Sequence, residues 1–100
     1  MIIRRYVDVK NQGQASRLVS EGYIPLISKI PGLVSFHLMD CGGGVMVSVG
    51  VFETMHAADQ ASLIAAAFVR TNLAPLLHGA PEVFSGAVVC HRHSHAPIMN

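Results

Sequence analysis

The sequence predicts an α+β fold of the ferredoxin-like type, with element order βαββαβ and two helices on one face of a four-stranded antiparallel sheet. Stretches with a period of two alternate with stretches of helical period, and they follow one another in that order. The length of 100 residues suits a single domain. Only 13% of the residues are charged while 51% are hydrophobic, against about 25% charged residues in typical soluble domains. This balance favours a surface that is partly covered by a subunit or that encloses a ligand cavity.

The first strand and helix are expected in residues 2–9 and 12–30. In the strand, Arg4 and Tyr6 share one face, because side chains alternate along an extended chain. Asn11, followed three residues later by a glutamine, resembles a capping box at the start of the helix. Pro25 lies inside the helical pattern, and since proline lacks an N–H, it should kink or divide this helix.

A central hairpin is expected from strands at residues 33–40 and 45–53, joined by the Gly-rich turn CGGG. Four valines, at positions 45, 47, 49 and 51, alternate with Met46, Ser48, Gly50 and Phe52, so the strand is apolar on both faces. One face packs under the helices. We interpret the other, which is apolar yet dotted with Ser, Gly and His, as a surface that an identical chain closes into a barrel with a small cavity.

The second helix is expected from His56 to Leu73, capped by Thr54, and the last strand from Glu82 to His91. Residues 1–92 then form the domain, and residues 93–100 form a flexible tail.

Several functional classes are disfavoured by composition. A net charge of +1 gives no basic field for nucleic acid. No apolar run approaches the ~20 residues that span a bilayer, and the first residues lack the apolar core of a signal peptide. We therefore expect a cytoplasmic protein that binds neither nucleic acid nor membrane, with Cys41 and Cys90 reduced.

In this element order, residues 1–92 resemble the dimeric α/β-barrel superfamily. The resemblance is carried by three stretches, EGYIPLISKIPGLVSF, VSVGVFET and VRTNLAPLL. The similarity is to small antibiotic-biosynthesis-monooxygenase-like proteins in particular. It implies a homodimer with a ligand pocket between sheet and helices. Some such proteins oxidise aromatic polyketides with oxygen and no metal or organic cofactor, while related barrels degrade haem, isomerise lactones or only bind ligands.

The chain departs from that pattern in ways that disfavour haem degradation. It has no tryptophan, and Phe68 stands in a region where similar proteins often carry Trp. Its asparagines, at positions 11, 72 and 100, lie outside the expected strands.

The candidate catalytic residues are His37, Arg4 and Tyr6. A cavity-facing His37 could take a proton from a phenolic substrate, while Arg4 could hold an anionic or enolate oxygen and Tyr6 could donate to it. The alternatives are that His37 is a structural histidine, that Arg4 is a charge at the rim, and that Tyr6 is an aromatic residue of the interface. The expected substrate-binding residues are Phe36, Phe52, Phe68 and Met39.

His91, His93 and His95 lie on one side of an extended chain, spaced so that two could reach one metal. They occur at the end of the sequence without an acidic residue, so we expect adventitious metal uptake and neither a metal site nor a cofactor.

The predicted function is a homodimer with a hydrophobic pocket for a small aromatic or quinone-like compound, and the candidate activity is cofactor-independent monooxygenation. The alternative is a non-catalytic ligand-binding or assembly protein of the same fold.

Overall fold

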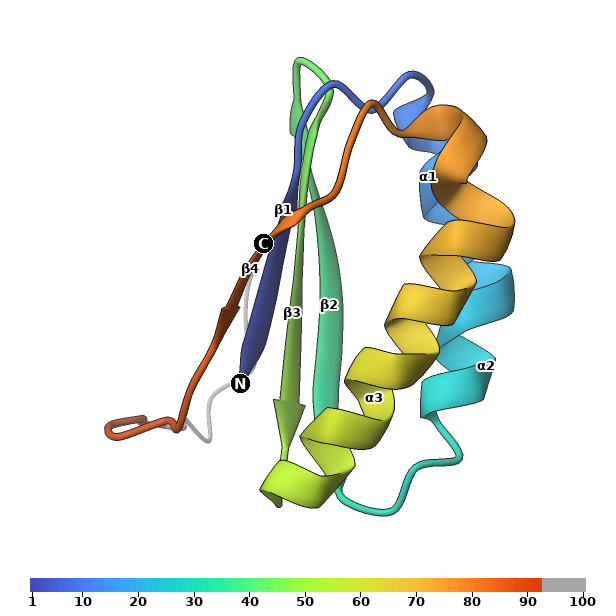
Figure 1. Ribbon diagram of the computed structural model, residues 1–100. Coiled ribbons are helices and arrows are strands. Elements are labelled where there is room, and N and C mark those ends of the chain that lie inside the picture. The colour runs from blue at the N-terminus through green and yellow to red at the C-terminus, as the bar shows by residue number, and fades with distance from the viewer. Residues whose placement is uncertain (93–100) are drawn as a thin grey trace.

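Two layers make up the computed structural model, which describes residues 1–92: a four-stranded antiparallel sheet, and helices that all lie on one face of it (Figure 1). The sheet order is β2-β3-β1-β4. The strands are β1 (Ile2–Tyr6), β2 (Leu33–Gly42), β3 (Val45–Phe52) and β4 (Glu82–Ser85). The predicted ferredoxin-like βαββαβ class is confirmed.

The strand register decides which side chains face the helices. Arg4 of β1 pairs with Ser48 of β3, and Ser48 also pairs with Leu38 of β2. Residues paired across an antiparallel ladder point to the same face of the sheet, and Ser48 is buried under the helices. His37 pairs with Val49 and so lies on the other face. The valine face of β3 is therefore the one that no helix of residues 1–92 covers, and the expectation that the face with Ser48 and Gly50 is the uncovered one is wrong.

The first helical segment consists of α1 (Gln12–Leu18), a π-helical turn η1 (Val19–Tyr23) and α2 (Ile24–Ile27). Its predicted cap is confirmed, since the Gln14 backbone N–H donates to Asn11 Oδ1 over 3.0 Å. The predicted disturbance around Pro25 takes the form of the π turn, in which the Ile24 N–H reaches back five residues to the Val19 carbonyl. The segment ends at residue 27, three residues earlier than predicted.

The second helical segment consists of α3 (Met55–Phe68), a π-helical turn η2 (Val69–Leu73) and a 3₁₀ turn η3 (Ala74–Leu76). Thr54 caps it as predicted, with Oγ1 accepting from the Ala57 N–H over 3.1 Å. Ala57, Ala61 and Ala65 are buried along one side of α3. Such small side chains let the helix lie close to its neighbours.

Both helical segments end in the same sequence pattern, in VSEGYIPLI at residues 19–27 and VRTNLAPLL at residues 69–77. In each, a valine begins a π turn, an apolar residue ends it four positions later, and proline and leucine follow. A proline cannot donate to the carbonyl four residues before it, and its ring crowds that turn. A wider π turn relieves this conflict, so each half of the fold carries the same local device.

Glycine is required in the turn between β2 and β3. Gly43 and Gly44 have φ values of +60° and +81°, which other residues rarely adopt. Gly42 pairs with Val45 across them, so these two glycines form the predicted hairpin turn.

The last strand is much shorter than predicted. It was expected to run from Glu82 to His91, but β4 ends at Ser85 and residues 86–92 have no regular structure. Ser85 pairs with Ile2, the first residue of β1, and the Gly86 N–H donates to the Met1 carbonyl over 3.1 Å. The predicted flexible tail, residues 93–100, lies outside the described residues.

Within residues 1–92, none of the helices combines the length and the apolar character that a membrane-crossing helix requires.

Candidate functional site

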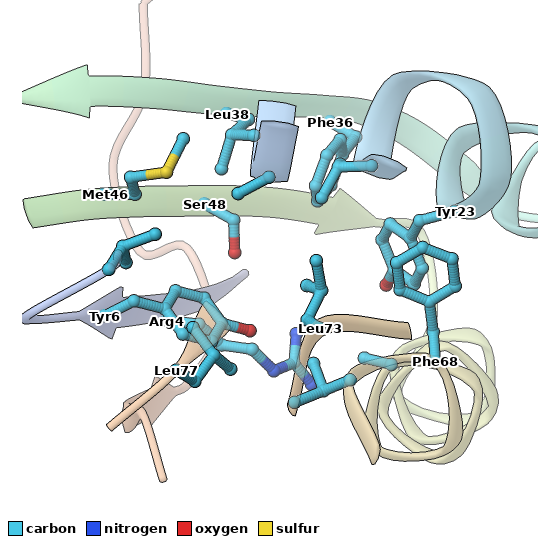
Figure 2. A pocket seen from close by; sticks show the side chains of 15 residues that line it. Arg4, Tyr6, Tyr23, Phe36, Leu38, Met46, Ser48, Phe68, Leu73 and Leu77 are labelled. Atoms are coloured by element: carbon cyan, nitrogen blue, oxygen red, sulfur yellow. The ribbon is translucent and has the colours of Figure 1, made fainter. Parts of the chain in front are cut away.

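A cavity of about 40 Å³ lies between the sheet and the helices. Its walls come from β1, β2 and β3 on one side and from both helical segments on the other (Figure 2). The lining residues are Arg4, Tyr6, Val9, Ala15, Val19, Tyr23, Phe36, Leu38, Met46, Ser48, Ala65, Phe68, Val69, Leu73 and Leu77.

Three aromatic rings close one end of the cavity. The ring centroids of Tyr23 and Phe36 lie 5.3 Å apart at 63°, an edge-to-face contact, and those of Tyr23 and Phe68 lie 5.6 Å apart. Such contacts add to the stability that burial alone gives. Because the rings come from η1, β2 and α3, they hold the two layers together at the cavity wall.

Polar side chains from β1 and β3 enter this apolar space. Ser48 is buried, with 6% of its surface exposed. Its hydroxyl and that of Tyr6 point into the space between the strands and the helical segment that carries Phe68 and Leu73 (Figure 2). The Arg4 guanidinium extends toward the same helical segment, where Nη2 donates to Ser62 Oγ over 3.2 Å.

The two tyrosines of the cavity are held in their protonated form. Burial raises the pKa of Tyr6 above its ordinary value of 10.0, and the nearby Arg4 charge opposes this only in part. Burial also raises the pKa of Tyr23. Both phenols are therefore hydrogen-bond donors at neutral pH. None of the lining residues is acidic.

The structure brings together some of the predicted site residues. Arg4 and Tyr6 line the cavity, as do Phe36 and Phe68. Phe52 packs against the hydrophobic core but does not line the cavity.

The other predicted site residues, His37 and Met39, lie on the helix-free face of the sheet. They pair with Val49 and Val47, and Met39 is 54% exposed. The sheet itself thus separates His37 from the cavity that Arg4 and Tyr6 enter.

Sequence reasoning missed Ser48, Ser62 and Tyr23 as site residues. A signal for Tyr23 was present in the repeated pattern of residues 19–27 and 69–77. The first and fifth residues of both copies line the cavity, namely Val19, Tyr23, Val69 and Leu73. A pattern that recurs at the end of each helix thus marks the helical wall of the site. Ser62 gave no signal of this kind.

No group of three or more histidine, cysteine or acidic side chains comes together as a metal site within residues 1–92. His91 is exposed, and the predicted partners His93 and His95 lie outside the described residues. Cys41 and Cys90 are both exposed and form no disulfide.

No protein-family model matches the sequence, and no curated protein does either. Solved structures do match. Rv0793 from Mycobacterium tuberculosis superimposes with a TM-score of 0.71 at 19% identity, over 92% of this chain and 96% of that one. NE2512, a protein of unknown function from Nitrosomonas europaea, superimposes with a TM-score of 0.68 at 21% identity, over 95% of this chain and 93% of that one.

A third match is a monooxygenase from the gene ActVA-Orf6 of Streptomyces coelicolor, whose structure holds the ligand nanaomycin D. It gives a TM-score of 0.65 at 22% identity, over 90% of this chain and 89% of that one. At such identities the likeness establishes the fold alone. The chain thus shares its ferredoxin-like βαββαβ fold with these three proteins, and this is the fold that its sequence resemblance implied.

Proposed function

We propose that this chain is a cytoplasmic homodimer whose cavity binds a small aromatic or quinone-like compound and oxidises it as a cofactor-independent monooxygenase. The observation that carries the proposal is an aromatic-walled apolar cavity that contains Arg4, Tyr6 and Ser48 and no acidic side chain. Ligand sites generally have this character, with a few polar groups set in an apolar wall.

The size of the cavity sets a condition on binding. Its volume of about 40 Å³ exceeds the ~10–15 Å³ that one water needs. It is well below the ~150 Å³ of an engineered cavity that binds benzene. An aromatic ligand therefore has to displace side chains, and we assign this movement to residues 69–77, which contribute Val69, Leu73 and Leu77 to the wall. A π turn followed by a 3₁₀ turn has poorer hydrogen-bond geometry than an α-helix, so this segment is the easiest part of the wall to move.

The proposed reaction needs only substrate and oxygen. A substrate carbanion passes electrons to O₂, one oxygen atom forms a new carbonyl on the ring, and the other leaves as water with two protons from the substrate. In this scheme Arg4 and Tyr6 stabilise the substrate's anionic oxygen, since aligned donors act strongly in a site with little water. His37 would have to pass through the sheet to act as the base here, so the proposal gives it no contact with the substrate in this cavity.

The monooxygenase match supports the activity in one respect, because that protein has the same fold and its structure holds the ligand nanaomycin D. An opposing observation favours a protein that binds without turnover. The titratable residues among those that line the cavity are Arg4, Tyr6 and Tyr23, none of which is a ready base at neutral pH.

The homodimer is proposed from the helix-free face of the sheet. Val47 and Val49 lie there beside Met39, and Met39 and Phe84 are more than half exposed. Apolar surface gathered on one face is typical of a subunit interface. A second copy of the same face would cover it with matching side chains.

Oxygen uptake in the presence of anthrone-type compounds tests the activity. We expect uptake above the rate of buffer alone, with one O₂ consumed for each quinone formed. Arg4→Gln should lower this rate by about 10² or more, the loss typical of removing one oxyanion donor. The matched control is Arg5→Gln, which changes the neighbouring arginine of the same strand on the opposite face and should leave the rate unchanged. Binding without uptake would favour the non-catalytic alternative.

A further inference from the structure

We infer that the cavity selects the ionised form of its aromatic ligand, because Arg4, Ser48 and Tyr6 form a receptor for one anionic oxygen and Ser62 positions the guanidinium. This inference rests on the proposed function and specifies the charge of its ligand.

The Arg4 charge is not neutralised by an acidic side chain of residues 1–92. The ion pair in this part of the chain joins the neighbouring Arg5 to Glu82, at 3.9 Å, on the other face of the sheet. No residue that lines the cavity is acidic. A positive charge that is partly withdrawn from water without a counterion raises the free energy of the empty protein. An anion in the cavity would relieve that cost, whereas a neutral ligand would not.

Ser48 provides a second donor at the same place. It is more than nine-tenths buried, and it lines the cavity. Its hydroxyl points into the cavity (Figure 2). Ser48 pairs directly with Arg4 between β3 and β1, a geometry that sets the two Cβ atoms about 5 Å apart. The serine and the arginine can therefore reach one ligand atom together.

Tyr6 provides a third donor, two residues along β1 on the same face. Its raised pKa keeps the phenol protonated at neutral pH. An oxyanion accepts several hydrogen bonds at once, and bonds with an ionised partner are roughly twice as strong as bonds between neutral groups. The three donors therefore favour an ionised oxygen over a carbonyl or an ether oxygen.

Ser62 fixes where the guanidinium lies. Its Oγ accepts from Arg4 Nη2 over 3.2 Å, and this bond joins α3 to β1 across the layers. A guanidinium has five N–H donors, so the bond to Ser62 leaves four for a ligand and solvent. Ser62 does not line the cavity, so it is a positioning residue.

The test compares two quinones of nearly the same shape by isothermal titration calorimetry at pH 7. The first, 2-hydroxy-1,4-naphthoquinone, is ionised at this pH, and its 2-methoxy analogue is neutral. We expect the anion to bind about tenfold more tightly or better. Arg4→Gln should reduce the ratio of the two affinities to about one, while the matched control Arg5→Gln should leave the ratio unchanged. Ser62→Ala should lower the ratio without changing the affinity for the methoxy compound, which a general loss of structure would not do.

The outcomes separate this inference from the proposed function. Equal affinities in the unmodified protein, or tighter binding of the methoxy compound, would overturn the inference and leave the aromatic pocket standing. Binding of neither compound would overturn both. If Arg4→Gln does not fold, as judged by its circular dichroism melting curve, Ser48→Ala and Tyr6→Phe take its place. Each should lower the ratio, and an unchanged ratio in both would contradict the receptor.

Discussion

At the scale of the residue, the two tyrosines connect the cavity to the stability of the fold. Burial raises the pKa of Tyr6 and of Tyr23 above the value of 10.0 that an unfolded chain has. A group whose pKa is raised by folding stabilises the native state at pH values below its unfolded pKa. That contribution is lost as the pH rises through the folded pKa.

This linkage predicts that alkaline pH destabilises the protein through these two residues. The free energy of unfolding should fall as the pH rises above about 10. Urea unfolding at a series of pH values from about 8 to about 11 measures it. The chain has 2 tyrosines, so Tyr6→Phe with Tyr23→Phe removes every phenol and should flatten the alkaline limb. An equally steep limb in the double variant would show that other groups cause the loss.

The sequence predicted that Arg4 and Tyr6 share one face of a strand, but it could not place His37 relative to them, for a physical reason that is visible at single residues. The period of two puts Arg4 and Tyr6 on one face of β1 without any knowledge of the rest. His37 is on β2, and β3 lies between the two strands. A change of one residue in register moves a side chain to the other face. The register that pairs His37 with Val49 and Arg4 with Ser48 is a tertiary property, which sequence alternation alone does not fix.

At the scale of the element, the contact between η1 and α3 depends on the absence of a side chain. A Cβ added at Gly22 would lie 2.8 Å from Cε1 of Phe68. Phe68 is buried and contacts the Tyr23 ring, so it cannot swing outward. Gly22 thus permits the close approach that keeps the Phe68 ring at the cavity wall.

Gly22→Ala should therefore push the Phe68 ring toward the cavity. The better helix propensity of alanine is worth up to ~1 kcal/mol, against ~1–3 kcal/mol for overpacking, so a net loss of about 1 kcal/mol is expected. Ligand affinity should fall at the same time. The matched control is Gly13→Ala in α1, where the nearest atom, Asn11 Oδ1, is 3.7 Å away, and it should not lower stability. Chemical denaturation of both variants measures the difference, and equal stabilities would contradict this packing.

The elements themselves were predictable to the extent that local chemistry determines them. Asn11 and Thr54 marked both helix starts, because a capping side chain acts within three residues. Three glycines marked the hairpin. The end of β4 could not be predicted, since it depends on the register in which β4 pairs with β1, and that register is a tertiary property. The π turns were visible only as a disturbance near Pro25, because propensities distinguish helix from strand and not one helical register from another.

At the scale of the whole molecule, the account depends on the face of the sheet that no helix covers. Packing a second copy against this face would bury Met39 and the valines around it, which single-domain packing in residues 1–92 leaves open. The cavity lies on the other side of the sheet. Loss of the proposed dimer would therefore not remove a cavity side chain, but it would expose the back of the strands that hold Arg4 and Ser48 in register.

Sedimentation velocity at micromolar concentration tests this central claim most directly. The unmodified chain should sediment as a species of twice its 10.7 kDa mass. Met39→Lys, which changes a residue that is 54% exposed on the helix-free face, should shift the protein toward monomer. The matched control Leu63→Lys, at a position on α3 that is 75% exposed, should leave the dimer intact. A stable, soluble monomer of the unmodified chain would contradict the account.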